Sequence, residues 1–116
     1  MPELYDERRT EPRFPTNGEA TFELAGREWR AEILDLSLNG LKLARPAGFE
    51  PAPASRFRIA LAIPGIDPFS ADVLLHHVER AQFGLEFYDM PTPDFAVLAG
   101  AIEQFHRLRR RSKVSP

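Results

Sequence analysis

The sequence predicts a mainly β protein, a six-stranded antiparallel β-barrel with a mobile N-terminal arm and a C-terminal α-helix. Three observations lead to this prediction. Apolar and polar residues alternate with a period of two in six short segments between about residues 18 and 90. Turn-forming residues separate these segments at the close spacing typical of barrels and sandwiches. Beyond residue 91 the apolar period becomes that of a helix.

The length of 116 residues fits one domain with a hydrophobic core. We expect an arm at 1–17, a barrel at 18–90, a helix at 91–112 packed on the barrel, and a tail at 113–116. The chain has no cysteine, which excludes disulfides, thiolate metal sites and thiol nucleophiles. No apolar leader is visible, and the longest apolar run, 95–102, is too short to span a bilayer. We therefore expect a cytoplasmic protein without a membrane span.

The net charge of −2 is unevenly distributed. Eight of the fifteen basic residues lie in two clusters, which are Arg8, Arg9 and Arg13 in the arm and Arg107, Arg109, Arg110, Arg111 and Lys113 near the C-terminus. The remaining surface is acidic enough to repel a long phosphate backbone, whereas a local cluster can still hold a small anion. This balance argues against general nucleic-acid binding.

The arm contains two arginines at a spacing that suits a small ligand. Pro12 favours an extended backbone at Glu11, so a helix through this stretch is not expected. Arg9 and Arg13 would then lie about 13 Å apart, enough to clasp a ligand from two sides. The planar guanidinium fork binds phosphate oxygens or the O6/N7 edge of guanine through two parallel bonds. The alternative is a solvated basic arm without a specific partner.

The strands follow in order along the chain. They are expected at 18–24, 27–36, 41–45, 56–63, 69–80 and 83–87. A turn at Ala25-Gly26 joins the first two, and residues 46–54, with three prolines, form a loop. Four phenylalanines fall on the apolar faces of these strands and are expected in the core, namely Phe22, Phe57, Phe83 and Phe87.

The connection from Asp35 to Gly40, Asp-Leu-Ser-Leu-Asn-Gly, carries more polar groups than a hairpin needs. Asn39-Gly40 indicates a tight turn, because both residues tolerate positive φ. Asp35 and Ser37 are expected to point from one face of the strand end, where a carboxylate and a hydroxyl can read a base edge or a sugar. The alternative is a capped turn in which these side chains bond local backbone amides.

The helix is predicted from its start signal and its apolar stripe. Thr92 is expected as the N-cap, Pro93 as the first helical residue and Asp94 in the first turn. The stripe consists of Phe95, Leu98, Ile102 and Phe105, with Ala99 beside them. The basic run 107–113 agrees with the helix dipole and is interpreted as a solvated tail. It could instead dock an acidic partner or add a phosphate contact.

The arginine motif of the arm and the Asp-Ser-Gly motif of the turn occur in a fixed order along the chain. Arg9-x-x-x-Arg13 is followed about 20 residues later by Asp35-x-Ser37-x-x-Gly40 within an all-β pattern. Together they resemble the PilZ domain, the bacterial receptor module for cyclic di-GMP. The likeness runs from about Arg8 to Phe87, and Gly84-Leu85-Glu86-Phe87 is similar to the closing Gly-x-x-Phe strand of that family.

The resemblance implies a role for each motif residue. Arg9 and Arg13 would wrap the ligand and contact its guanine edges and phosphates. Asp35 and Ser37 would contact the other guanine, and Gly40 would allow close approach. An arginine at the position of Arg8 is associated in the family with two stacked ligand molecules rather than one.

A departure from the family pattern lies on the strand before the closing one. Many members carry a stacking tryptophan there, whereas this chain has His77. Histidine can also offer a flat ring on which a purine stacks. Alternatively, His76 or His77 is only an exposed or half-buried strand residue.

The predicted function is a cyclic di-GMP-binding adaptor. The ligand, one or two molecules, would order the arm, and the signal would pass to an unidentified effector protein, since no output domain is visible. No enzyme is expected: His76 and His77 lack metal-ligand or triad spacing, and adjacent strand residues point to opposite faces. No metal or cofactor is implied. The alternatives are a PilZ-like scaffold that does not bind the nucleotide and a small nucleic-acid-binding barrel, which would need exposed aromatic residues on a basic face.

Overall fold

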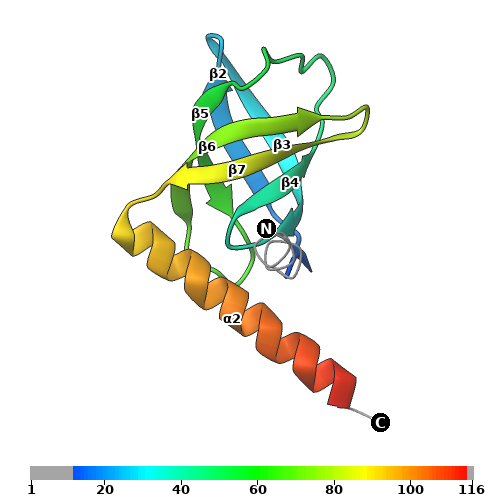
Figure 1. Ribbon diagram of the computed structural model, residues 1–116, viewed down its shortest axis with the longest axis vertical. Helices are drawn as coiled ribbons and strands as arrows, with labels where there is room; N and C mark the ends of the chain where they lie inside the picture. Colours follow the sequence, from blue (N-terminus) through cyan, green and yellow to red (C-terminus); the bar gives the residue numbers. More distant parts are fainter. Residues whose placement is uncertain (1–11, 115–116) are drawn as a thin grey trace, which may run out of the picture.

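The computed structural model describes the backbone of residues 12–114 and the side chains of residues 12–109. Its elements, shown in Figure 1, are β1 (Phe14–Pro15), β2 (Glu19–Leu24), β3 (Arg27–Leu36), β4 (Gly40–Ala44), β5 (Arg56–Ala62), β6 (Phe69–Val78), β7 (Gln82–Asp89) and α2 (Thr92–Val114). The alternating segments of the sequence form the strands, and the burial of one face with exposure of the other is most regular in β5.

Six of the strands close into an antiparallel barrel. They follow the order β3-β2-β5-β6-β7-β4, and β3 pairs again with β4 to complete the ring. Strand β3 can serve both neighbours because its first part pairs with β2 and its last part with β4. Closure leaves the barrel strands without a long open edge. The predicted six-stranded antiparallel barrel with a C-terminal helix is therefore confirmed.

The short strand β1 pairs with the last residues of β3, beyond the point where β2 begins. Phe14 lies opposite Leu36, and Pro15 lies opposite Asp35, both in β3. The side chain of Phe14 is only 3% exposed. Residues 14 and 15 thus belong to the sheet, although the sequence-based division assigns them to the arm. Arg8 and Arg9 lie outside the described residues.

One end of the barrel is closed by Phe49, from the loop between β4 and β5. Its side chain is 1% exposed, and its ring centroid lies 4.6 Å from that of Phe83 and 5.0 Å from that of Trp29. Arg45 donates a 2.8 Å hydrogen bond from Nε to the Phe49 carbonyl and so fixes the loop. The sequence predicts the loop but gives no sign of this core residue, because a loop has no periodicity to reveal which side chain turns inward.

The opposite end of the barrel is covered by α2, which crosses below the strands and continues beyond them (Figure 1). Leu98 and Ile102 are buried in the same cluster as the strand residues. The carboxylate of Asp94 accepts a 2.8 Å hydrogen bond from the backbone amide of Ser70 in β6. This contact fixes the start of the helix against the barrel.

Two details of the helix differ from prediction. Phe95 is not part of the buried stripe, because its side chain is 48% exposed, whereas Ala101 is buried. The turn that contains Asp94 faces β6, so the next residue is directed away from the barrel. Thr92 is the first helical residue and not the N-cap, since the amide of Phe95 bonds to the carbonyl of Pro91.

Candidate ligand-binding site

A β-bulge sets the direction of the Asp35 side chain. Ile33 lies opposite Leu43 and Asp35 opposite Lys42, so that Leu34 is an extra residue in β3. Strict alternation would place Ile33 and Leu36 on opposite faces, yet both are buried. The extra residue shifts the alternation, so that Asp35 stands on the outer surface of the barrel, partly exposed.

A second bulge lies in β6, where Leu75 is opposite Leu85 and His77 opposite Gly84. His76 is the extra residue. The expectation that His76 and His77 point to opposite faces is therefore wrong. Their rings meet edge to face with centroids 5.6 Å apart, and both line the same surface groove. Within residues 12–109, however, no three His, Asp or Glu side chains are grouped so that they could hold a metal ion.

The registers place four residues in one row across the barrel. Asp35 in β3 is opposite Lys42 in β4, Lys42 is opposite Gly84 in β7, and Gly84 is opposite His77 in β6. The groove above this row has a volume of about 610 Å³, within the usual range for small-ligand sites. Arg13 contributes to its lining. Residues from separate parts of the sequence thus meet on one outer face.

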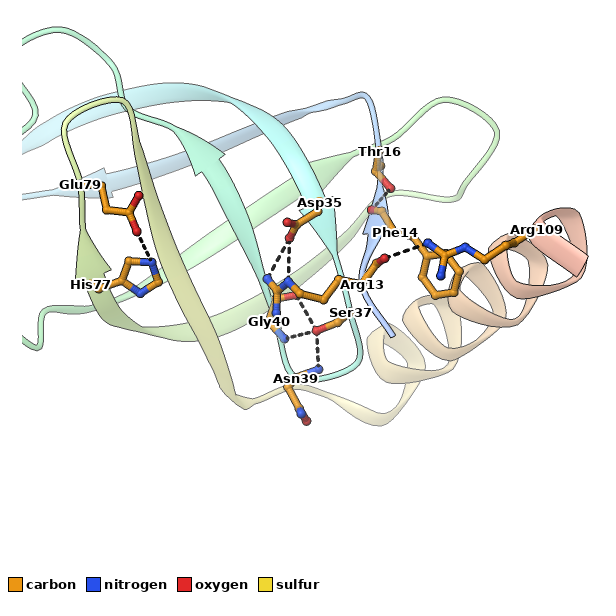
Figure 2. A network of polar contacts seen from close by, with 10 residues as sticks. All are labelled: Arg13, Phe14, Thr16, Asp35, Ser37, Asn39, Gly40, His77, Glu79 and Arg109. Carbon is orange, nitrogen blue, oxygen red and sulfur yellow. Dashed lines mark hydrogen bonds and ion pairs between the residues drawn. The ribbon is translucent and has the colours of Figure 1, made fainter. Parts of the chain in front are cut away.

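Arg13 and Asp35, one residue from each motif, form an ion pair in this groove region (Figure 2). The guanidinium donates to Asp35 Oδ1 from Nη2 at 2.8 Å and from Nε at 3.2 Å. The two side chains are 44% and 21% exposed. An exposed pair of this kind stabilises a protein by about 1 kcal/mol or less, because solvent screens it. A ligand whose charged groups fit Arg13 or Asp35 better can therefore replace the partner of either residue in this ion pair.

Ser37 is the centre of the turn between β3 and β4. Its Oγ accepts hydrogen bonds from the amides of Asn39 and Gly40, each at 3.2 Å, and donates to the Gly40 carbonyl at 3.3 Å. The side chain is fully buried, at 0% exposure. For Ser37 the structure has the capped turn that the sequence left as an alternative. The role of this hydroxyl in the observed conformation is to fix the backbone beside Asp35.

Gly40 is the first residue of β4, and neither it nor Asn39 has positive φ. The reason given above for the Asn39-Gly40 turn is therefore wrong, since the connection is a three-residue turn fixed by Ser37. What requires glycine is space: a Cβ at Gly40 would fall on the carbonyl oxygen of Leu85 in β7. Only glycine lets the start of β4 approach β7 this closely.

Gly84 has a similar steric role on the other side of the groove. A Cβ there would lie 2.6 Å from Cε1 of His77, because the imidazole ring rests over the glycine. Nε2 of His77 lies 3.4 Å from a carboxylate oxygen of Glu79, which holds the ring at the far end of the row (Figure 2). Gly84 thus provides the space in which the His77 ring lies across the strands.

The structure brings together most of the described motif residues, but not in equal roles. Arg13, Gly40 and His77 line the groove and Asp35 adjoins it through Arg13, whereas Ser37 is buried in the turn. The ligand site predicted from the sequence did not include the further lining residues Asn39, Lys42, His76 and Glu86. The outward position of Lys42 in its alternating strand, close to the second motif, is the signal that could have identified it. The groove offers cationic donors, carboxylate acceptors and imidazole faces, which suits a polar aromatic anion.

The sequence was compared with models of protein families and with curated proteins. The sequence of residues 7–104 matches the model of the PilZ domain family. Among curated proteins, none matches the sequence significantly. No helix in the described part of the chain is both long and apolar enough to cross a membrane.

Solved structures share the fold at low sequence identity. The PilZ domain of YcgR from Escherichia coli with c-di-GMP has a TM-score of 0.72 and 20% identity, covering 94% of this chain and 99% of that one. YcgR in complex with c-di-GMP has a TM-score of 0.77 and 22% identity, covering 91% of this chain and 49% of that one. The Bacillus subtilis inhibitor of motility, MotI/DgrA, has a TM-score of 0.73 and 14% identity, covering 93% and 53%. This chain spans about half the length of the last two proteins.

Proposed function

Because the chain belongs to the PilZ domain family, we propose that it is a receptor for cyclic di-GMP that acts as a cytoplasmic adaptor rather than as an enzyme. The observation that supports this most directly is the meeting of Arg13 and Asp35 beside the groove. One residue comes from each of the two motifs, 22 positions apart in the sequence. The solved complexes of E. coli YcgR with c-di-GMP share this barrel fold and support the choice of ligand.

In the proposed complex, Arg13 and Asp35 exchange their mutual ion pair for contacts with the ligand. The guanidinium fork of Arg13 bonds to phosphate oxygens or to the O6/N7 edge of a guanine. The carboxylate of Asp35 accepts hydrogen bonds from the N–H groups of a guanine. Since the exposed pair is weak, its loss opposes binding by only about 1 kcal/mol.

The rest of the row completes the site. Lys42, in the centre of the row, supplies a positive charge for a phosphate, and the imidazole of His77 offers a flat surface on which a purine can stack. Ser37 acts mainly by fixing the turn beside Asp35, and Gly40 by letting β4 approach β7 closely. Arg8 and Arg9, which lie outside the described residues, would close over the ligand from the arm.

The adaptor part of the proposal concerns the arm. Ordering each residue costs about 1–2 kcal/mol, so several charge-assisted contacts are needed to hold it. A cyclic dinucleotide supplies two phosphates and two guanines, which can engage all three arginines of the arm. The ligand would thereby change the surface presented to an unidentified effector protein.

Replacing Arg13 with alanine is expected to weaken cyclic di-GMP binding about 100-fold. Two hydrogen bonds from a charged group to the ligand contribute about 3–4 kcal/mol together. About 1 kcal/mol of this is recovered in the variant, because the ion pair with Asp35 no longer competes with the ligand. The net loss of binding free energy is about 2–3 kcal/mol, and each 1.4 kcal/mol changes the dissociation constant tenfold. Isothermal titration calorimetry of both proteins with cyclic di-GMP measures the difference. The molar ratio also tests Arg8, since two ligands per chain would fit its implied role.

The matched control is Arg58→Ala. Arg58 forms an ion pair with Asp72 at 3.2 Å on the outside of the barrel, but it does not line the groove. Its replacement removes the same charge from a similar pair and should change affinity by less than about twofold. Absence of binding by the unmodified protein would refute the receptor proposal and leave a PilZ-like scaffold. Equal losses of affinity in both variants would mean that Arg13 acts only through general electrostatic attraction.

Hydrogen exchange tests whether the ligand orders the arm. Amides of residues 3–11 are expected to exchange at least about tenfold more slowly with saturating cyclic di-GMP, because ordering and hydrogen bonding both restrict exchange. Amides of β2, which pairs with β3 and β5 and contributes no residue to the groove, serve as the internal control. Equally fast exchange of the arm in the free and saturated protein would contradict this part of the proposal.

A further inference from the structure

The last turns of α2 contact the segment that carries Arg13. The guanidinium of Arg109 donates a 3.0 Å hydrogen bond from Nη2 to the backbone carbonyl of Arg13. Its Cζ lies 4.4 Å from the ring centroid of Phe14, within the range of cation–π attraction. The same ring packs against Phe105, at 5.8 Å between centroids, and meets His106 edge on, at 5.9 Å.

Phe14 is thus an anchor between two elements. Its backbone pairs with Leu36 at the end of β3, and its side chain is enclosed by three residues of one helix face, Phe105, His106 and Arg109. Arg13 directly precedes Phe14 in the chain, and its side chain extends from this anchor to Asp35 (Figure 2). The helix therefore fixes the position of the Arg13 backbone, from which the Arg13 side chain extends to the groove.

We propose that the end of α2 is a positioning element of the ligand site, in which Arg109 holds the backbone of Arg13 so that its guanidinium reaches the groove. This inference rests on the proposed function. Arg109 does not line the groove, and its guanidinium is occupied by Phe14 and the Arg13 carbonyl. It acts through Arg13 and does not contact the ligand itself.

The positioning has a thermodynamic consequence for the helix. If contacts at Arg109 increase the affinity of the site, the ligand must stabilise those contacts by the same factor, because binding linkage is reciprocal. Bound cyclic di-GMP would therefore reduce fraying of α2 around Arg109. The helix end, which extends past the barrel in Figure 1, would report the occupancy of the groove.

The test compares Arg109→Ala with Arg107→Ala by titration with cyclic di-GMP. Arg107 lies on the same helix, is also exposed, and its ion pair is with Glu103 at 3.9 Å. Arg109→Ala should weaken binding about tenfold, the effect of losing one hydrogen bond to a charged group. Arg107→Ala, which removes the same charge, should change affinity by less than about twofold. Arg109→Lys, which keeps the charge over Phe14, should recover part of the affinity.

Two further measurements separate positioning from other effects. In an Arg13→Ala background, Arg109→Ala should cause no additional loss, because the residue acts only through Arg13. In the ligand-free protein, the amide chemical shifts of Arg13 and Phe14 should move in Arg109→Ala and stay unchanged in Arg107→Ala. The inference would be overturned if Arg109→Ala bound cyclic di-GMP with unchanged affinity, or if both helix variants lost affinity equally. If the unmodified protein binds no cyclic di-GMP, the proposed function fails, and unchanged shifts in Arg109→Ala would independently refute the positioning role.

Discussion

Alanine at Gly40 is expected to destabilise the fold by about 3 kcal/mol or more, the upper part of the range for overpacking. The added Cβ would fall on the carbonyl oxygen of Leu85, and the Cα of Glu86 is 3.1 Å away. Both are backbone atoms of β7, so no side chain can rotate to relieve the contact. The strands β4 and β7 must separate instead, which weakens the ladder that supports the groove. Urea denaturation of the purified variant measures the change in unfolding free energy.

Gly100→Ala is the matched control. Gly100 lies in α2, and a Cβ there would meet nothing within 4 Å. The same substitution should therefore raise stability by about 0.5–1 kcal/mol, since alanine favours the helix over glycine. If Gly40→Ala instead kept its stability and lost only cyclic di-GMP binding, the glycine would serve ligand approach, as the family resemblance implies, and not the approach of β4 to β7.

Truncation of Phe49 to alanine is expected to lower the unfolding free energy by about 3–5 kcal/mol. This is a large part of the 5–15 kcal/mol typical of a whole domain. The ring fills one end of the barrel and contacts Phe22, Trp29 and Phe83, at 5.6, 5.0 and 4.6 Å between centroids. Its removal leaves a cavity whose aromatic walls belong to separate strands and cannot readily close together. Thermal and urea unfolding, followed by circular dichroism, provide the measurement.

Phe95→Ala is the corresponding control on the surface. Phe95 is 48% exposed at the start of α2, so the same truncation should change stability by only about 0.5 kcal/mol. The sequence assigns the opposite importance to these two residues, because Phe95 follows a helical stripe and Phe49 lies in a loop. Similar losses from both substitutions would contradict the burial that distinguishes them.

Local patterns in the sequence determined the secondary structure. Period-two alternation defined the six barrel strands to within a few residues, and the change of period after residue 91 located the helix. Ala25-Gly26 formed the expected turn, with positive φ at both residues. These features depend on backbone preference and on which face of each element is apolar, and both are properties of neighbouring residues. The resemblance carried by Arg13, Asp35 and Gly40 likewise depended only on residue type and spacing.

The tertiary structure alone decided how the site is assembled. The extra residues Leu34 and His76 shift the alternation of β3 and β6, because each strand must match a partner that has one residue fewer. Those shifts direct Asp35 outward and place both histidines in the groove. The contact of Arg109 with Arg13 joins residues 96 positions apart, which no local pattern can encode. Alternation and spacing describe a chain along its length, whereas the groove is formed by contacts across strands and with the helix.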